Sequence, residues 1–369
     1  MLQKEDEMRV GFVGWRGMVG SVLMKRMEEE KDFDFLPERV FFSTSNVGGA
    51  GPVMAGKQPL EDANCVSALI ECDVIVTCQG SEWTAQMYPE LRKRGWQGFW
   101  LDSASALRME KDSIIVLDPI NRAMIEQGKE RGIKTYVGGN CTVSLMLMAC
   151  HGLFKNELVE WVSSMTYQAA SGAGAQYMIE LIKQMKAVSM VSDPALDALE
   201  LERVVSRCLQ SNLFPVDNFG VPLATSLIPW IDRLVLGGQT KEEWKGFTEA
   251  NKILGTETSI PIDGLCVRVG VMRCHSQALL IRLKSDVPLN EIEVMLRTAN
   301  RWVKVVANEE NATKKELTPA AVSGTLTIAI GRLHKAKMGG QYLKAFTIGD
   351  QLLWGAAEPI RRALRILVK

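Results

Sequence analysis

The stretch RVGFVGWRGMVG, residues 9–20, decides the fold of the first half of the chain. Residues 9–14 form a short apolar run typical of a buried strand, and residues 17–27 carry apolar side chains at helical spacing. Glycine recurs at every third position from 11 to 20. Because glycine has no side chain, backbone N–H groups at the helix start can approach a pyrophosphate. The stretch therefore predicts a dinucleotide-binding strand, turn and helix.

Further apolar runs follow this unit and alternate with helical segments. They lie at residues 40–45, 72–80, 99–103, 113–118 and 135–137. This alternation predicts an α/β chain with a mainly parallel, doubly wound sheet. We expect this dinucleotide-binding domain to cover residues 1–140, with a C-terminal helix over 351–369, capped by Asp350, returning to it.

Longer, partly alternating runs at 161–168 and 265–284 indicate a second domain over residues 141–350. Alternation of this kind favours a largely antiparallel mixed sheet in an α+β domain. Helical spacing over 176–209 is interrupted at Pro194, and residues 244–254 predict another helix.

Composition limits the classes of function. The 369 residues include 43 acidic and 43 basic side chains, so no net charge favours nucleic acid or an anionic membrane. The eight cysteines lack the paired spacings of a zinc site or a small disulfide scaffold, which predicts no metal site and a reducing, cytoplasmic setting. The most apolar stretch, 145–154, is too short to span a bilayer. We expect neither a nucleic-acid nor a membrane partner.

The end of the second predicted strand bears on which dinucleotide binds. An NAD-binding unit places Asp or Glu there against the ribose 2′-hydroxyl, whereas this chain has Ser43, Thr44 and Ser45, with Arg16 in the glycine turn. No carboxylate repels a 2′-phosphate at this position. The sequence favours NADP over NAD and leaves use of both open.

A second glycine turn, GGNCTVS at residues 138–144, places Cys141 where the turn enters an apolar helix. The first turn of a helix offers unpaired N–H groups and the positive end of the helix dipole, so a thiol there loses its proton more easily. Cys141 is therefore a candidate nucleophile. The alternative is a small buried hydrophobic residue, as most intracellular cysteines are.

Three histidines can supply proton transfer: His151, His275 and His334. His151 lies nearly three helical turns beyond Cys141, and His334 lies among basic residues typical of a surface. His275 remains the candidate base, with a buried structural histidine as the alternative.

Two arginines, Arg108 and Arg268, are candidates to bind a carboxylate or phosphate, and either can instead be a surface charge. In a regular strand Arg268 and His275 have opposite parity and would face opposite sides of the sheet. We therefore predict a bulge or bend between them, with Gly270 the expected position.

Taken together, several motifs resemble the aspartate-semialdehyde dehydrogenases of Gram-negative bacteria, over nearly the whole chain. The matching motifs are GFVGWRGMVG (11–20), FFSTS (41–45), GGNCTVS (138–144), YQAASG (167–172), EEWK (242–245) and LCVRVGVMRCHSQ (265–277). The resemblance implies a Rossmann-like first domain, a catalytic and dimerisation domain, a homodimer, and reduction of β-aspartyl phosphate by NADPH to aspartate β-semialdehyde in lysine, threonine and methionine biosynthesis.

The resemblance also implies residue roles. Cys141 would form the thioester, and His275 would act as general acid and base. Substrate-binding positions implied by the family are Arg108, Asn140, Gln168, Glu242, Lys245 and Arg268, with Arg268 on the α-carboxylate, Glu242 on the ammonium, Gln168 orienting the reacting group and the rest on phosphate. Implied cofactor positions are Arg16, Gly17, Met18, Val19, Thr44, Ser45, Gln79, Ser171, Gly172, Pro194 and Gln351.

Other functions remain open from the residues themselves. N-acetylglutamyl-phosphate reductase, an acyl-phosphate reductase of the same architecture, has no substrate ammonium for Glu242 to bind. A thiol hydrolase or acyltransferase using Cys141 and His275 would not need the glycine turn at Gly17. A catalytically silent binding module would need neither feature.

Overall fold

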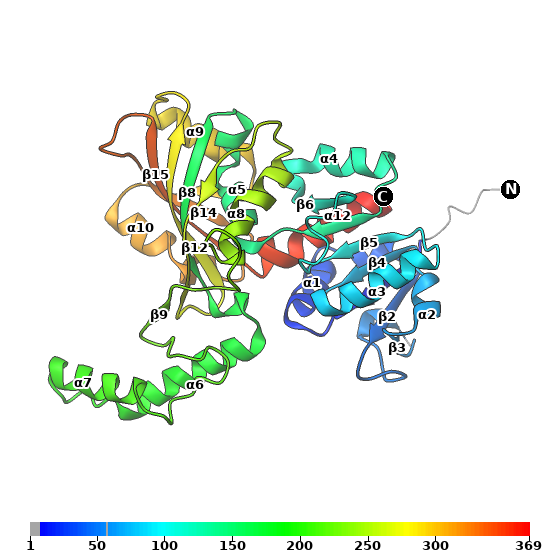
Figure 1. Cartoon of the computed structure of the whole chain (residues 1–369), viewed down its shortest axis with the longest axis horizontal. Coiled ribbons are helices and arrows are strands. Elements are labelled where there is room, and N and C mark those ends of the chain that lie inside the picture. Colours follow the sequence, from blue (N-terminus) through cyan, green and yellow to red (C-terminus); the bar gives the residue numbers. More distant parts are fainter. Residues whose placement is uncertain (1–7, 57) are drawn as a thin grey trace. The chain divides into compact units, whose positions relative to one another are not determined.

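The computed structural model describes residues 8–56 and 58–369, which form two compact units (Figure 1). The first unit contains the described residues up to Met148 together with Thr248–Ser259 and Leu352–Lys369. The second contains Ala149–Phe247 and Ile260–Gln351. These boundaries differ from the predicted ones because residues 141–148 and 248–259 pack with the first unit.

Within the described residues, the first unit contains a seven-stranded sheet in the order β3-β2-β1-β4-β5-β7-β6. Its strands are β1 Val10–Val13, β2 Arg39–Ser43, β3 Glu61–Asp62, β4 Val74–Thr77, β5 Phe99–Asp102, β6 Ser113–Val116 and β7 Thr135–Gly138. Each neighbouring pair is parallel. The strand order reverses at β1, which lies between β2 and β4, so the predicted doubly wound sheet is confirmed.

Helices cover both faces of this sheet because its strands are buried on both sides. The helical segments are α1 Met18–Glu29, η1 Asp32–Phe35, η2 Val53–Ala55, α2 Val66–Ile70, α3 Ser81–Lys93, α4 Asp118–Glu130 and α12 Glu358–Val368. Phe12 packs in one core with Leu23 of α1 and Leu364 of α12, whereas the next residue, Val13, packs in another with Met87 of α3. Alternate side chains of β1 thus fill two separate cores.

The predicted N-cap at Asp350 is wrong. Asp350 is the last residue of β15, and its carboxylate accepts a hydrogen bond from the backbone N–H of Gly324 and pairs with Arg273. The following helix begins later, with a π-helical segment, η4 Leu353–Ala357, that leads into α12. A buried carboxylate before a helix can serve a tertiary ion pair instead of a cap, and sequence does not distinguish the two.

The second unit contains, within the described residues, an eight-stranded mixed sheet whose main path is β13-β14-β15-β12-β8-β11-β9, with β10 also pairing with β8. Its strands are β8 Val159–Gln168, β9 Leu227–Ile228, β10 Ile262–Asp263, β11 Cys266–Val269, β12 Cys274–Leu283, β13 Val303–Val305, β14 Ile328–Lys335 and β15 Tyr342–Asp350. The long strands β8, β12, β15 and β14 are antiparallel neighbours. The expected largely antiparallel mixed sheet is confirmed.

The predicted bend between Arg268 and His275 is a complete reversal of the chain. β11 runs parallel to β8, whereas β12 runs antiparallel to it on its other side. Residues 270–273 connect the two strands, so the parity of one continuous strand no longer applies.

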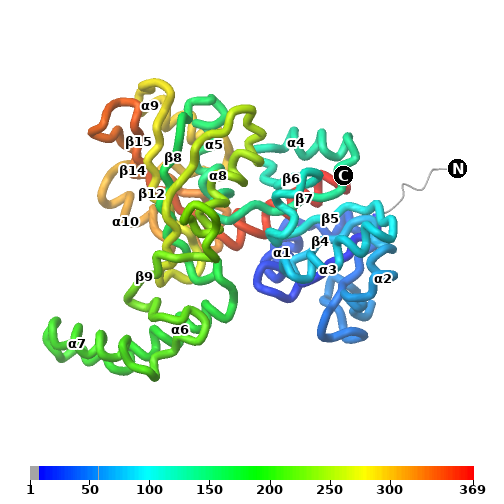
Figure 2. The backbone as a smooth tube through the Cα atoms, in the orientation of Figure 1, coloured from blue at the N-terminus to red at the C-terminus, as the bar shows by residue number. Residues whose placement is uncertain are grey.

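Further helical segments of the second unit are η3 Ala170–Gly172, α6 Ala175–Val191, α7 Ala198–Leu209, α9 Leu289–Ala299, α10 Glu310–Glu316 and α11 Pro319–Val322. Figure 2 shows α6 and α7 as successive helices, and the break between them contains Pro194, as predicted. Asp197 caps α7 by accepting hydrogen bonds from the N–H groups of Leu199 and Glu200. Helices α5 Cys141–Lys155 and α8 Lys241–Leu254 contribute residues to both units.

Candidate functional site

The turn between β1 and α1 is built by close backbone approaches that only glycine allows. Gly14 has φ of +71°, and a Cβ there would lie 2.5 Å from the backbone N of Gln79. A Cβ on Gly20 would lie 2.2 Å from the carbonyl oxygen of Gly14. Gly17 is the N-cap of α1, with no side-chain hydrogen bond to the first turn. The helix start therefore presents backbone N–H groups at the edge of the sheet, as a pyrophosphate site requires.

Arg16 lies in this turn and reaches the end of β2. Its Nη2 donates to Ser43 Oγ at 2.7 Å and to Ser45 Oγ at 3.2 Å, and both Arg16 and Ser45 are exposed. Thr44 between the serines is also exposed. A cation and hydroxyl groups thus meet where the ribose 2′-position of a dinucleotide is expected, which fits a 2′-phosphate.

The turn between β7 and α5 places Cys141 as the first residue of α5. Asn140 caps the helix: its Oδ1 accepts hydrogen bonds from the N–H of Thr142 at 3.0 Å and of Val143 at 3.2 Å. Cys141 is partly exposed. Burial raises the pKa of Cys72, Cys150 and Cys274 to about 12, so these thiols stay protonated and unreactive.

Arg108 and Glu249 hold the backbone of this turn, and the sequence analysis did not identify Glu249. Arg108 donates from Nε to the carbonyl oxygen of Gly138 at 2.6 Å and from Nη1 to Glu249 Oε1 at 3.1 Å. Glu249 Oε2 accepts the N–H of Asn140 at 2.6 Å. A signal existed: Glu249 follows Glu242 and Lys245 at i+7 and i+4 on α8, the spacing of one helix face.

His275 is fully buried on β12, and its ring has a defined tautomer. The N–H of Ala169 donates to His275 Nδ1 at 3.0 Å, so the proton of the neutral ring lies on Nε2. Burial, assisted by the Arg268 guanidinium and opposed by the Glu242 carboxylate, lowers the pKa of His275 to about 3. The ring is therefore neutral at physiological pH.

Four further predicted side chains are linked within the second unit. Arg268 Nη1 donates to the carbonyl oxygen of Ala169 at 2.7 Å. Gln168 Nε2 donates to Glu242 Oε1 at 3.2 Å, and Glu242 Oε2 accepts from Lys245 Nζ at 2.9 Å. All four are at least nine-tenths buried. Lys245 Nζ also contacts Asp232, which the sequence analysis did not identify.

Among the predicted cofactor residues of the second unit, Ser171, Gly172 and Gln351 come together and Pro194 does not. Gln351 Nε2 donates to Ser171 Oγ at 2.8 Å, and a Cβ on Gly172 would lie 3.0 Å from His275 Nε2. Pro194 follows α6, a 17-residue helix that begins just after Gly172 and spans roughly 25 Å.

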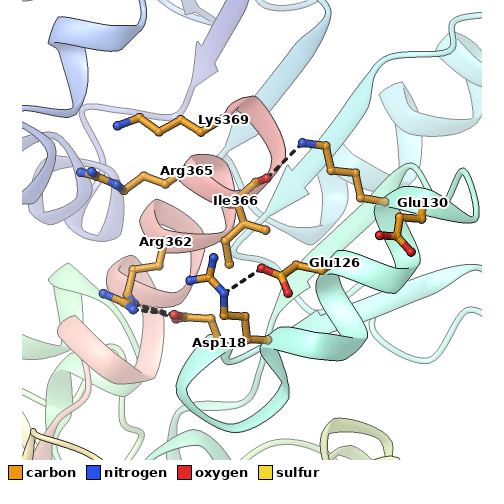
Figure 3. A pocket seen from close by; sticks show the side chains of 9 residues that line it. Asp118, Glu126, Glu130, Arg362, Arg365, Ile366 and Lys369 are labelled. Carbon is orange, nitrogen blue, oxygen red and sulfur yellow. Dashed lines mark hydrogen bonds and ion pairs between the residues drawn. The ribbon is translucent and has the colours of Figure 1, made fainter.

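A groove of about 860 Å³ between α4 and α12 contains none of the predicted site residues (Figure 3). Two ion pairs lie within it: Arg362 donates to Asp118 at 2.7 Å, and Arg122 donates to Glu126 at 2.8 Å. Across residues 8–56 and 58–369, no cluster of three metal-ligating side chains occurs. No helix in the same residues is long and apolar enough to cross a membrane.

Family models and solved structures match both parts of the chain. Residues 9–128 match the semialdehyde dehydrogenase NAD-binding domain, and residues 150–354 match the semialdehyde dehydrogenase dimerisation domain. The aspartate semialdehyde dehydrogenase structure from Francisella tularensis is 48% identical, with 98% of this chain and 99% of that chain covered and a TM-score of 0.96.

Two more distant solved structures share the fold. The Vibrio cholerae aspartate semialdehyde dehydrogenase II, complexed with ASA, is 19% identical with a TM-score of 0.78, and 98% of each chain is covered. The Candida albicans aspartate semialdehyde dehydrogenase with NADP is 14% identical with a TM-score of 0.66, again with 98% of each chain covered.

Proposed function

The chain belongs to the aspartate-semialdehyde dehydrogenase family, and we propose that it reduces β-aspartyl phosphate to aspartate β-semialdehyde through a thioester on Cys141. The observation that carries the assignment of the nucleophile is the β7–α5 turn. It presents a partly exposed thiol at the start of a capped helix, whereas Cys72, Cys150 and Cys274 are buried and protonated. The positive end of the α5 helix dipole at this position also favours negative charge on the acyl oxygen.

In the proposed reaction Cys141 forms and breaks the bond to the substrate, and His275 acts on the substrate oxygen. The Cys141 thiolate attacks the acyl carbon of the substrate, the C–O bond to phosphate breaks, and phosphate leaves with the electron pair. Bound NADPH supplies the hydride that reduces the resulting thioester. The Nε2–H of the neutral His275 ring can donate a hydrogen bond to the oxygen on that carbon, which carries the negative charge after reduction, and the C–S bond then breaks with its electron pair on sulfur as the aldehyde leaves.

Substrate recognition follows from charge. We assign Arg268 to the substrate α-carboxylate and Glu242 to its ammonium, with Gln168, hydrogen-bonded to Glu242, orienting the reacting group. Arg108, Asn140 and Lys245 are assigned to the phosphate. Lys245 pairs with Glu242 in the structure, so each of these two charges is compensated before substrate binds.

We propose NADP as the cofactor, bound by the β1–α1 turn through Arg16, Gly17, Met18 and Val19. Other proposed contacts are Thr44, Ser45, Gln79, Ser171, Gly172, Pro194 and Gln351. The support is the arrangement of Arg16 with Ser43 and Ser45, which offers a cation and hydroxyl groups to a 2′-phosphate and gives a 2′-hydroxyl no carboxylate partner.

We propose a homodimer whose interface includes α6. Residues 150–354 contain the dimerisation domain, and Ile179, Ile182 and Met185 form an exposed apolar stripe on α6 at helical spacing. Ile182→Glu should shift the protein toward monomer in sedimentation. An unchanged sedimentation coefficient would show that this stripe is not part of the dimer interface. The eight free cysteines fit a reducing, cytoplasmic location.

The test is reduction of NADP⁺ by the purified protein with aspartate semialdehyde and phosphate. Cys141→Ser and His275→Asn should each lower turnover by at least about 10²-fold. The matched control is Cys65→Ser, because Cys65 is, like Cys141, a partly exposed cysteine at a helix start and should be dispensable. Full turnover by Cys141→Ser, or preference for N-acetylglutamate semialdehyde, would overturn the proposal.

A further inference from the structure

We infer that Glu249 is a positioning residue for Cys141: with Arg108, it fixes the two peptide groups between Gly138 and Asn140, just before the nucleophile. The inference rests on the proposed role of Cys141. Glu249 lies on α8 and is 2% exposed. Its two carboxylate oxygens have different donors, Arg108 Nη1 at 3.1 Å and the N–H of Asn140 at 2.6 Å.

The contacts fall on consecutive positions of the turn. Arg108 donates to the carbonyl oxygens of Gly138 at 2.6 Å and Gly139 at 3.1 Å, and Glu249 accepts the N–H of Asn140. Cys141 follows immediately. Two of these residues are glycines, whose backbone has the widest conformational freedom. Hydrogen bonds at each peptide group therefore select one conformation of a turn that the residues alone would leave variable.

Each member of the pair depends on the other. Glu249 is buried, and a buried carboxylate is costly without a cation and hydrogen bonds. Arg108 is 8% exposed, and its Nε, Nη1 and Nη2 all have partners within the protein. Glu249 thus fixes the guanidinium that we assign to the phosphate, as well as the turn that carries the thiol.

Position matters at this point because attack on an acyl carbon needs near-contact geometry. A displacement of about 1 Å from a change outside the reacting groups can cost on the order of 10²-fold in rate. Uniform loss of substrate affinity would instead raise KM without lowering kcat. A positioning role therefore predicts a fall in kcat.

The test compares Glu249→Gln and Glu249→Asp in the NADP⁺ reduction assay. In Glu249→Gln, an NH₂ group must face either Arg108 or the N–H of Asn140, and both are donors. We expect kcat to fall by about 10- to 100-fold with KM for both substrates changed less than about threefold. Glu249→Asp keeps both acceptor oxygens and should recover part of the loss.

Asp32→Asn is the matched control. Asp32 is also a fully buried carboxylate of the first unit with one arginine on each oxygen, Arg361 at 2.8 Å and Arg365 at 2.5 Å. Asp32 lies in η1, between α1 and β2, and both of its arginines belong to α12. The Asp32→Asn variant should lower the melting temperature, as Glu249→Gln does, and should leave kcat unchanged.

The outcomes separate the inference from the proposed function. A wild-type protein without phosphate-dependent NADP⁺ reduction would overturn the function itself. An active wild type, an inactive Cys141→Ser and a Glu249→Gln with wild-type kcat would overturn the inference alone. If Glu249→Gln does not fold, Glu249→Asp carries the test: wild-type kcat contradicts the inference, and reduced kcat at unchanged KM supports it.

Discussion

Two junctions in the first unit share one design and differ in how the helix start is satisfied. At β1–α1 and at β7–α5, a buried parallel strand leads through a glycine turn into a helix. Gly17, the N-cap of α1, offers no side-chain acceptor to the first turn. Asn140 caps α5 with its side chain, and the first helical position is Cys141.

The difference shows how one structural unit supports two chemistries. An uncapped helix start leaves backbone N–H groups for an external anion, which suits a dinucleotide pyrophosphate. A capped start, with its turn held by Arg108 and Glu249, fixes a side chain of the protein at the same kind of position. The first junction binds a mobile ligand, and the second orients a nucleophile.

The largest expected effect comes from breaking the first junction. Gly20→Ala would place a Cβ 2.2 Å from the Gly14 carbonyl oxygen, so the turn must shift. We expect KM for NADP⁺ to rise by about 10- to 100-fold and stability to fall by about 1–3 kcal/mol. Gly17→Ala meets no atom closer than 3.3 Å and should raise KM less. Equal effects of the two changes, measured by steady-state kinetics, would contradict the proposed packing role of Gly20.

Arg16→Ala tests which ligand the first junction favours. Removing the guanidinium removes a charge-assisted contact to a 2′-phosphate, so KM for NADP⁺ should rise about tenfold. KM for NAD⁺ should change little, because NAD⁺ has a hydroxyl there. Parallel kinetics with both cofactors check this, and an equal rise for both would show that Arg16 only shapes the turn.

The pH dependence of stability tests a residue outside both junctions. Neither junction contains a histidine, whereas the proposed acid, His275, lies on β12. Its pKa of about 3 lies below the unfolded value, so between those values the unfolded chain binds a proton that the folded protein does not. Stability should therefore fall as pH decreases from 7.5 to 5.5, with His275 contributing on the order of 1.5 kcal/mol. In chemical denaturation, the His275→Asn variant should lack this pH-dependent part of the free energy of unfolding. The His334→Asn variant, changed at a partly exposed histidine, should keep it.

The smallest effect comes from exchanging the caps. Asn140→Ala removes the acceptor for two N–H groups of α5 and should cost about 1 kcal/mol in the free energy of unfolding. Gly17→Asn gives α1 the acceptor that it lacks; it should gain a few tenths of a kcal/mol and raise KM for NADP⁺. A Gly17→Asn variant with unchanged KM would show that the first-turn N–H groups are not needed by the cofactor.

Sequence patterns predicted the first unit well because its strands are short, apolar and separated by glycine turns. They also predicted the break at Pro194, where α6 ends at Val191. Strands β13, β14 and β15 were not predicted individually. β14 and β15 mix polar and apolar residues, with buried positions that include glycine and threonine, so no apolar run marks them.

The candidate site was predicted in its residue types but not in its supporting contacts. Cys141 is visible from its glycine turn and His275 from elimination among three histidines. Glu249 shares a helix face with Glu242 and Lys245, a spacing that the sequence shows, but only the fold brings it to Asn140. Asp350 is the opposite case. The sequence predicts a helix cap there, but the carboxylate forms an ion pair with Arg273.

Acylation of Cys141 is the most direct test of the account. The protein is mixed with aspartate semialdehyde and NADP⁺ without phosphate, quenched in acid and digested for mass spectrometry. We predict one aspartyl group in thioester linkage on the peptide that contains Cys141, lost when phosphate is added before the quench. An unmodified Cys141, or acylation of another cysteine, in a preparation that turns over with phosphate would contradict covalent catalysis at this position.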